Sequence, residues 1–257
     1  MGSKAKITKY ICPIIQRFID VTKADVYIEP FVGGANVIDK IVCNNRVGSD
    51  INRYLIELLK YAQQRKPFPE NILYDEYCKV RDCYNSKSND FEDWYIGLVG
   101  FLASYNGRFF DGGFAKPTVS GGKLRNYYRE HLGNLLSQNL TGIDFRCCDY
   151  SFYKNVENSV IYCDPPYANT KKYNNRFDFD IDEFCNFVRN VSTSNIVLIS
   201  EQSAPDDFIC IWKQIVKRQI NTKDKFDQTE KLFVHKSLCS KYDIDSILNI
   251  SAERKLF

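Results

Sequence analysis

Short apolar runs and helical patterns alternate at the start of the chain, stop, and resume after residue 140, and this interrupted alternation most constrains the fold. Val26-Tyr27-Ile28 favours a strand that ends in a glycine-containing turn, and we expect an apolar helix to begin near Ala35. A second strand ends at Asp50, and Asn52 is a suitable N-cap for a helix over residues 53–64. Strand, glycine turn, helix, strand and acid, in this order, predict the opening of a doubly wound α/β sheet.

The alternation breaks at Pro67, and the stretch that follows contains two helical patterns with a glycine-rich aromatic segment over residues 105–114 between them. We therefore predict a small, mainly helical insertion over residues 65–139. The doubly wound domain would then be formed by residues 1–64 and 140–257. Its second part contains apolar runs typical of buried parallel strands, the clearest being residues 195–200.

Composition places few limits on function. A formal net charge of +3, with 44% hydrophobic and 26% charged residues, is typical of globular proteins, so any nucleic-acid surface must be argued from local charge. The segment Met1-Gly2-Ser3-Lys4 has no apolar signal character and no run could span a membrane, so we expect a cytoplasmic protein without a membrane partner. The ten cysteines are scattered without paired CxxC elements, which favours buried reduced thiols over disulfides or a metal site.

The motif Asp164-Pro165-Pro166-Tyr167 follows the apolar run of residues 159–163. An amino nitrogen on a nucleobase is a poor nucleophile, because its lone pair is delocalised into the ring. A carboxylate and the Pro165 carbonyl, both accepting hydrogen bonds from the N–H groups, would draw that lone pair out of the ring plane, and the two prolines fix the backbone so that this carbonyl is free to point into the site. The Tyr167 ring can stack on a base flipped out of a duplex. A simple strand-closing turn is the alternative.

A glycine motif, Glu29-Pro30-Phe31-Val32-Gly33-Gly34, follows the first predicted strand. Gly33 and Gly34 allow the backbone to approach a ligand closely. Asp50 comes where dinucleotide-type folds place the acid that bonds ribose hydroxyls. A loop with a solvated acid explains the same residues equally well.

The predicted insertion has an uneven charge, since several basic residues face only Asp111 between residues 108 and 129. Glycines and aromatic residues are interleaved with them, as in segments that grip phosphates while a few side chains read base edges. An ordinary solvated loop is the alternative. We expect DNA contacts from Asn106, Arg108, Lys116, Lys123, Arg125, Asn126 and Arg129.

With these motifs in this order, the chain resembles the Dam-type, or alpha-class, family of DNA adenine-N6 methyltransferases, in which a recognition domain separates the glycine motif from Asp-Pro-Pro-Tyr. The resemblance extends over most of the chain and includes Ser49-Asp50-Ile51-Asn52 and Asp149-Tyr150. It implies a Rossmann-like sheet that binds S-adenosylmethionine, with residues 65–139 as the target-recognition domain. It further implies a pocket for the target adenine at Asp164, Pro165 and Tyr167. The implied cofactor contacts are Lys4, Glu29, Phe31, Gly33, Gly34, Asp50, Asp149, Tyr150 and Asp164.

The resulting hypothesis is direct methyl transfer from S-adenosylmethionine to N6 of an adenine in double-stranded DNA, without a metal. Methylation of cytosine carbon 5 is excluded, because that reaction needs a nucleophilic Cys, usually after Pro, and no Pro here precedes Cys. Methylation of cytosine N4, of RNA or protein glutamine, and a catalytically silent DNA-binding role stay open. So do the recognised sequence and a restriction endonuclease partner.

Overall fold

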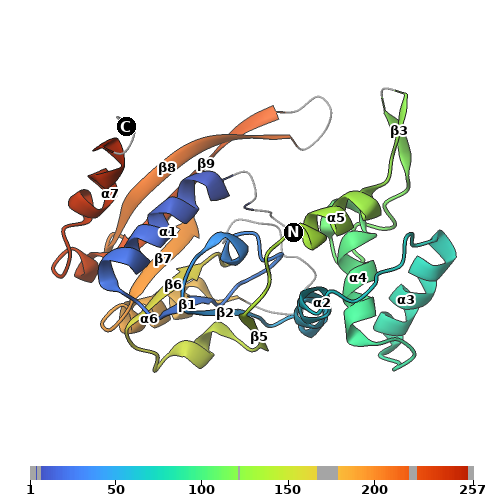
Figure 1. Ribbon diagram of the computed structural model, residues 1–257, viewed down its shortest axis with the longest axis horizontal. Coiled ribbons are helices and arrows are strands. Elements are labelled where there is room, and N and C mark those ends of the chain that lie inside the picture. Colours follow the sequence, from blue (N-terminus) through green and yellow to red (C-terminus); the bar gives the residue numbers. More distant parts are fainter. Residues whose placement is uncertain (1–3, 5–6, 121, 167–178, 220–224, 254–257) are drawn as a thin grey trace. The chain divides into compact units, whose positions relative to one another are not determined.

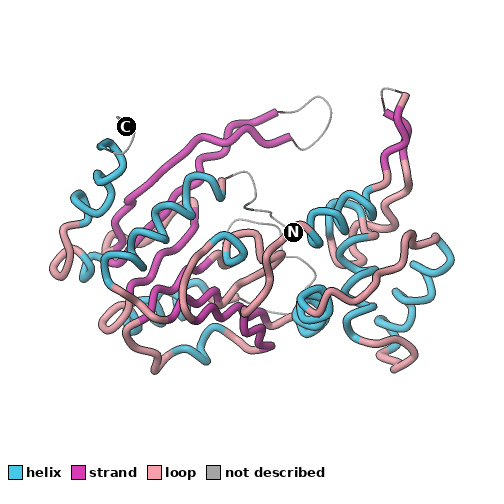
Figure 2. The backbone as a smooth tube through the Cα atoms, viewed as in Figure 1, coloured by secondary structure: helices cyan, strands magenta, loops and turns pink. Residues whose placement is uncertain are grey.

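The computed structural model describes residue 4 and residues 7–120, 122–166, 179–219 and 225–253. Seven strands form one sheet in the order β5-β2-β1-β6-β7-β9-β8, and β3 and β4 form a separate two-stranded sheet (Figures 1 and 2). The seven strands are β1 (Val26–Glu29), β2 (Asn45–Asp50), β5 (Ile143–Cys147), β6 (Ser159–Cys163), β7 (Ile196–Glu201), β8 (Phe208–Gln219) and β9 (Lys225–His235). This mixed α/β sheet confirms the predicted fold class. The chain divides into two compact units, which are described in turn.

The first unit contains residue 4 and residues 32–40 and 48–148. Its helices are α2 (Arg53–Gln63), α3 (Tyr74–Ser86), α4 (Asp93–Leu102) and α5 (Tyr127–Leu136), with the hairpin of β3 (Thr118–Ser120) and β4 (Lys123–Arg125) before α5. The predicted cap is present: the Asn52 side chain accepts hydrogen bonds from the backbone N–H groups of Tyr54 and Leu55 at the start of α2. Helices α2 and α4 approach closely at Gly97, where a Cβ would lie 2.1 Å from the Tyr54 carbonyl oxygen.

The second unit contains residues 7–31, 41–47 and 149–257. Strand β6 pairs in parallel with β1 and with β7, whereas β9 runs antiparallel to β7 and β8 antiparallel to β9. Helix α1 (Thr8–Thr22) buries Ile11, Ile15 and Phe18, and α6 (Ile181–Val191) has Asp180 as its N-cap. The Arg17 guanidinium donates a 2.5 Å hydrogen bond to the Leu248 carbonyl, which ties α1 to α7 (Ile244–Glu253).

The helix predicted near Ala35 is wrong. Ala35 has a left-handed backbone (φ 55°), and only the short 3-10 helix η2 (Ile38–Lys40) follows it. The buried apolar residues Val37, Ile38 and Ile41 produce the misleading pattern, because a short apolar run has no period of its own. Strands β8 and β9 are 12 and 11 residues long and pair with each other along most of their length.

Candidate active site

The acid of the Asp-Pro-Pro motif directly follows a fully buried strand of the sheet. Every residue of β6 is buried, and the strand pairs with neighbours on both sides. The chain continues directly into Asp164, which is half-buried, then buried Pro165 and exposed Pro166. The motif therefore lies at the carboxyl ends of parallel strands, where open α/β sheets bind ligands. Tyr167, predicted to stack on the target base, lies outside the described residues.

A second carboxylate, Glu29, lies close to this motif. Glu29 ends β1, is 2% exposed, and accepts a 2.6 Å hydrogen bond from the Tyr27 hydroxyl. Burial raises the pKa of the Cys163 thiol, and the negative charges of Asp164 and Glu29 raise it further. Both carboxylates therefore lie near this thiol at the end of β6. Burial and then the Glu29 charge also raise the pKa of Tyr27 well above its usual value. Tyr27 is therefore a neutral hydrogen-bond donor to Glu29 throughout the physiological pH range.

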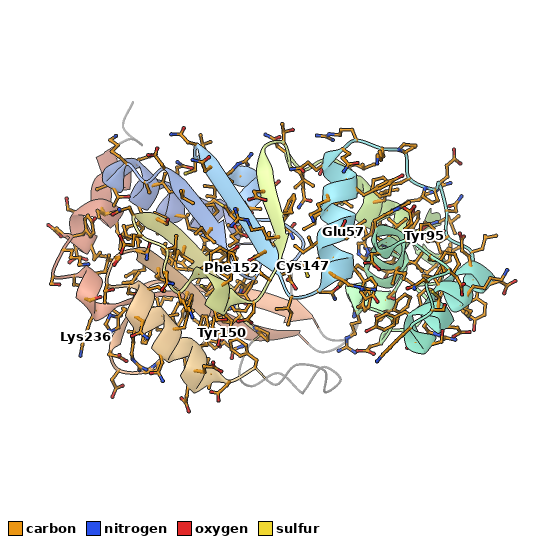
Figure 3. The ribbon with its side chains drawn as sticks, turned by 90° about the horizontal axis from the view of Figure 1, so that it is seen from below. Glu57, Tyr95, Cys147, Tyr150, Phe152 and Lys236 are labelled. Atoms are coloured by element: carbon orange, nitrogen blue, oxygen red, sulfur yellow. The ribbon has the colours of Figure 1, made fainter. Side chains whose placement is uncertain are left out.

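An aromatic cluster surrounds the predicted cofactor residues Phe31 and Tyr150. Their rings are stacked, with centroids 5.6 Å apart and planes 29° apart. Tyr150, which is labelled in Figure 3, is buried, and burial raises its pKa to about 12. Asp149 fixes the turn at Tyr150, because its carboxylate accepts a 2.9 Å hydrogen bond from the Ser151 N–H. Three further rings contact this pair from the edge or stack within the cluster: Phe179, Phe184 and Phe187.

In the first unit, Asp50 ends β2 as the sequence predicts. Its carboxylate accepts hydrogen bonds from the backbone N–H groups of Gly33, Ile51 and Asn52, the last at 3.0 Å, yet burial raises its pKa to about 6. The neighbouring Ser49 hydroxyl is buried and has no hydrogen-bond partner among the described residues.

The glycine loop next to Asp50 leaves room for a ligand. Gly33 has φ 49° and nothing within 4 Å of the position a Cβ would take. The Gly34 carbonyl accepts a 2.7 Å hydrogen bond from the Gln138 side chain, which anchors the loop. Lys4, the other cofactor residue predicted in this unit, is buried. Of the predicted cofactor residues, the first unit contains Lys4, Gly33, Gly34 and Asp50. The second unit contains Glu29, Phe31, Asp149, Tyr150 and Asp164.

The residues predicted to contact DNA differ in how they are held. Asn106, Arg108 and Lys116 are exposed, and Asn106 has a left-handed backbone (φ 55°). Lys123 lies in β4, directly before Leu124, and Leu124 and its cross-strand partner Val119 are both 73% exposed. The hairpin therefore offers two apolar side chains to solvent.

The three remaining predicted DNA contacts are engaged within the protein. Arg125 makes 2.8 and 2.9 Å hydrogen bonds to the Glu130 carboxylate. Asn126 is the N-cap of α5 and accepts a hydrogen bond from the Arg129 N–H. The Arg129 guanidinium donates a 3.0 Å hydrogen bond to Asn71. Asn126 thus has a structural role, and contact with DNA would require Arg125 or Arg129 to exchange partners.

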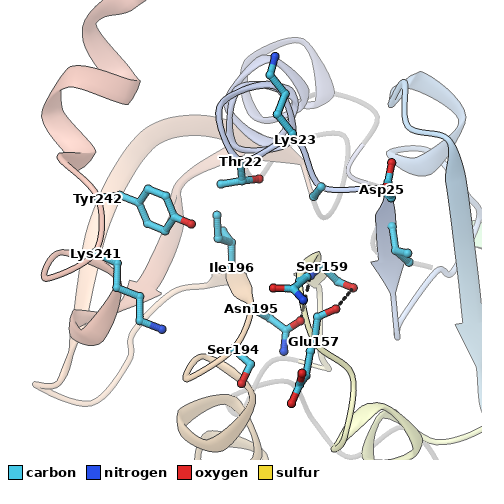
Figure 4. Close-up of a pocket in the computed structure, with 13 residues that line it drawn as sticks. Thr22, Lys23, Asp25, Glu157, Ser159, Ser194, Asn195, Ile196, Lys241 and Tyr242 are labelled. Carbon is cyan, nitrogen blue, oxygen red and sulfur yellow. Dashed lines mark hydrogen bonds between the residues drawn. The ribbon is translucent and has the colours of Figure 1, made fainter.

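A pocket of about 380 Å³ opens at the other end of the sheet (Figure 4). It is lined by the first residues of three strands, Val26, Ser159 and Ile196, so it lies at the opposite strand ends from Asp164. Its buried Asn195 side chain accepts a hydrogen bond from the Ser159 N–H and donates to the carbonyls of Val156 and Val191. Asn195 therefore has a structural role, because its side chain links the start of β6 to the end of α6.

The ten cysteines are present as thiols. No group of three or more His, Cys, Asp or Glu residues suited to a metal ion occurs among the described residues. Within that part of the chain, no helix is both long and apolar enough to cross a membrane.

Known proteins are similar to the chain in sequence. It is 26% identical to the type II methyltransferase M.MjaIII of Methanocaldococcus jannaschii, with 86% of this chain and 91% of that protein covered. It is 31% identical to a DNA adenine methylase of Vibrio cholerae, where 60% of each chain is covered. The solved structure of TrmN from Thermus thermophilus covers 86% of this chain and 47% of that one, with 10% identity and a TM-score of 0.33, too low to support a conclusion.

The family model described as D12 class N6 adenine-specific DNA methyltransferase matches residues 1–191. This range includes the glycine motif, Asp50, the predicted insertion and the Asp-Pro-Pro-Tyr motif. The chain therefore belongs to the D12 class of N6 adenine-specific DNA methyltransferases.

Proposed function

We propose that this DNA adenine methyltransferase transfers a methyl group from S-adenosylmethionine to N6 of an adenine flipped out of double-stranded DNA. The observation that carries the proposal is the position of Asp164 and Pro165, at the end of the fully buried strand β6 and beside the buried Glu29 carboxylate. An acid held by a rigid strand at the ligand-binding edge of the sheet suits a reaction that depends on positioning.

Asp164 and the Pro165 carbonyl accept hydrogen bonds from the two amino hydrogens of the target adenine, and one of these hydrogens leaves nitrogen as a proton once the methyl group is bound. These hydrogen bonds localise the nitrogen lone pair outside the ring plane and stabilise the positive charge that develops on nitrogen during transfer. Pro166 supports this role because its ring restricts the backbone that carries the Pro165 carbonyl. No covalent enzyme intermediate is needed, and Tyr167 is proposed to stack on the flipped base.

The residues around the glycine loop fit S-adenosylmethionine. The Ser49 hydroxyl lacks a partner among the described residues. The half-buried Asp50 carboxylate has a raised pKa, so added hydroxyl donors would stabilise its charged form. We assign the ribose to Asp50, the adenine ring to Asp149 and Tyr150, and the methionine end to five residues: Lys4, Glu29, Phe31, Gly33 and Gly34. When bound, the cofactor supplies an electrophilic methyl group on a sulfonium.

The insertion of residues 65–139 is proposed to read the DNA. Arg108 and Lys116 are exposed and suited to phosphates, and Asn106 beside them is suited to a base edge. The hairpin residues Val119 and Leu124 add exposed apolar surface. Because DNA is the substrate, the cytoplasm of a bacterial or phage-infected cell is the proposed place of action.

The test is transfer of a radiolabelled methyl group to unmethylated genomic DNA by the parent enzyme and by Asp164→Ala. The variant should still bind S-adenosylmethionine, because the other implied cofactor contacts are unchanged, and lose most turnover, by about 100-fold or more. Mass spectrometry of the digested DNA should find N6-methyladenine. Turnover equal to the parent in the variant, or a methyl group on another atom, would refute the proposal.

A further inference from the structure

The antiparallel ribbon formed by β8 and β9 extends beyond the rest of the sheet. Strand β9 pairs with β7 over four positions, the last being Glu201 with Lys231. The six residues before Lys231, from Lys225 to Glu230, pair with β8. At about 3.3 Å per residue, this part is about 20 Å long. Figure 1 shows the two strands continuing together past β7.

The ribbon extends from the strand ends that carry the Asp-Pro-Pro motif. Strands β6 and β7 are parallel, with Cys163 paired to Ile199, so Asp164 and Glu201 both lie at their carboxyl ends. Because β9 is antiparallel to β7, residues that precede Lys231 continue past these carboxyl ends. Ribbon and motif belong to the same compact unit, so their placement on one edge does not depend on the other unit.

The charge of the ribbon is strongly basic. Residues 213–219 and 225–231 contain five Lys and Arg against two Asp and Glu, a formal net charge of +3 that equals the net charge of the whole chain. One of the two acids, Glu230, is 2% exposed and adds little negative charge to the surface. Lys213 is directly opposite Lys231 in the ladder, although like charges in that relation destabilise a sheet. On the same face, two residues along β8, Ile215 is 60% exposed.

We infer that the β8–β9 ribbon is a second DNA-binding surface, which contacts the phosphate backbone of the duplex next to the flipped adenine. This rests on the proposed function, because DNA must lie over the Asp164 edge. A two-stranded ribbon with basic residues suits duplex DNA, whose phosphates it can follow or whose major groove it can enter. The contact gives affinity without sequence preference and acts independently of the insertion.

The test compares two matched triple variants by fluorescence anisotropy with a mixed-sequence DNA duplex. In the ribbon variant, Lys213, Lys217 and Lys225 become Gln. In the control, the exposed residues Lys23, Lys236 and Lys241 become Gln, which removes the same charge at the opposite strand ends. The ribbon variant should bind at least about tenfold more weakly, and its slope of log affinity against log salt should be about three units shallower. The control should keep the parent slope.

A single variant, Lys213→Gln, tests the inference even if the triple variant misfolds. Its slope of log affinity against log salt should be about one unit shallower than that of the parent. If the lysines serve only to keep the β8 edge from aggregating, the variants will lose solubility while the slope stays unchanged, which overturns the inference. Equal slopes for ribbon variant and control overturn it as well. Methyl transfer at saturating DNA should persist in the ribbon variant. Failure of the parent to methylate would instead refute the proposed function.

Discussion

The Tyr27 hydroxyl donates a 2.6 Å hydrogen bond to the Glu29 carboxylate, and both residues are buried within β1. A buried carboxylate needs such donors, because burial disfavours its charged form. The pair therefore fixes the point where β1 passes into the glycine loop that is proposed to hold the cofactor. Tyr27→Phe should cost about 1–3 kcal/mol in the free energy of unfolding.

The same variant should raise the KM for S-adenosylmethionine more than it lowers kcat, because Glu29 loses its orientation while Asp164 is unchanged. Urea unfolding and steady-state kinetics are the measurements. Tyr10→Phe is the matched control, because Tyr10 is exposed. Equal effects of the two substitutions would show that the Tyr27 hydroxyl does not position Glu29.

The raised pKa of Asp50 leads us to expect that stability and cofactor affinity depend on pH. Burial raises its pKa from 3.8 to about 6, so the folded protein keeps a proton that the unfolded chain releases between these values. Stability should therefore fall as pH rises from about 4 to 6, by up to about 3 kcal/mol. Affinity for S-adenosylmethionine should rise through the same window, because the charged carboxylate is proposed to accept hydrogen bonds from the ribose hydroxyls.

Thermal unfolding and calorimetric titration from pH 4 to pH 8 measure these two effects. Asp50→Asn removes the titrating group and should flatten both profiles. A parent-like pH dependence in Asp50→Asn would assign the effect to another group.

Arg189 and Asp207 form an ion pair, from which we expect a loss of stability at low pH. The guanidinium contacts the two carboxylate oxygens at 2.6 and 3.0 Å, and this hydrogen bonding lowers the pKa of Asp207 to about 2. A lowered pKa stabilises the fold above pH 4, and the contribution is lost as pH falls towards 2. Arg189→Gln should lower the urea midpoint modestly at pH 7, and the difference from the parent should vanish near pH 2. A constant difference across this range would exclude the linkage.

Substitution by alanine should have opposite effects on stability at two glycines in helices of the first unit. A Cβ at Gly97 in α4 would overlap the Tyr54 carbonyl oxygen of α2 at 2.1 Å, so Gly97→Ala should destabilise the protein by about 1–3 kcal/mol. Gly133 in α5 has nothing within 4 Å of its Cβ position, so Gly133→Ala should stabilise it by about 0.5–1 kcal/mol. Chemical unfolding of both variants checks the close approach of α2 and α4; similar results for the two would contradict it.

The sequence predicted those parts of the site that depend on order along the chain. Asp50, Asn52 and Asp164 each follow or begin an element whose pattern is clear, so their places at strand ends or a helix start were predictable. The aromatic cluster was not predicted, because Phe31, Tyr150 and Phe184 come together only through the tertiary fold. The i, i+3 spacing of Phe184 and Phe187 after the Asp180 cap was the one local signal.

Helix α3 and the β3–β4 hairpin were also missed. Only three residues of α3 are buried, so its sequence shows little apolar period. The hairpin strands are three residues each and expose Val119 and Leu124, which removes the usual alternation.

The fully buried strand β6 continues directly into Asp164, so the protein interior itself holds the proposed catalytic acid. Substitutions inside that strand, such as Ile161→Val, would affect the proposed substrate pocket through the backbone rather than through any contact with DNA. Screens for loss of methylation would therefore recover interior apolar positions alongside polar ones, and sorting them requires a stability measurement for each.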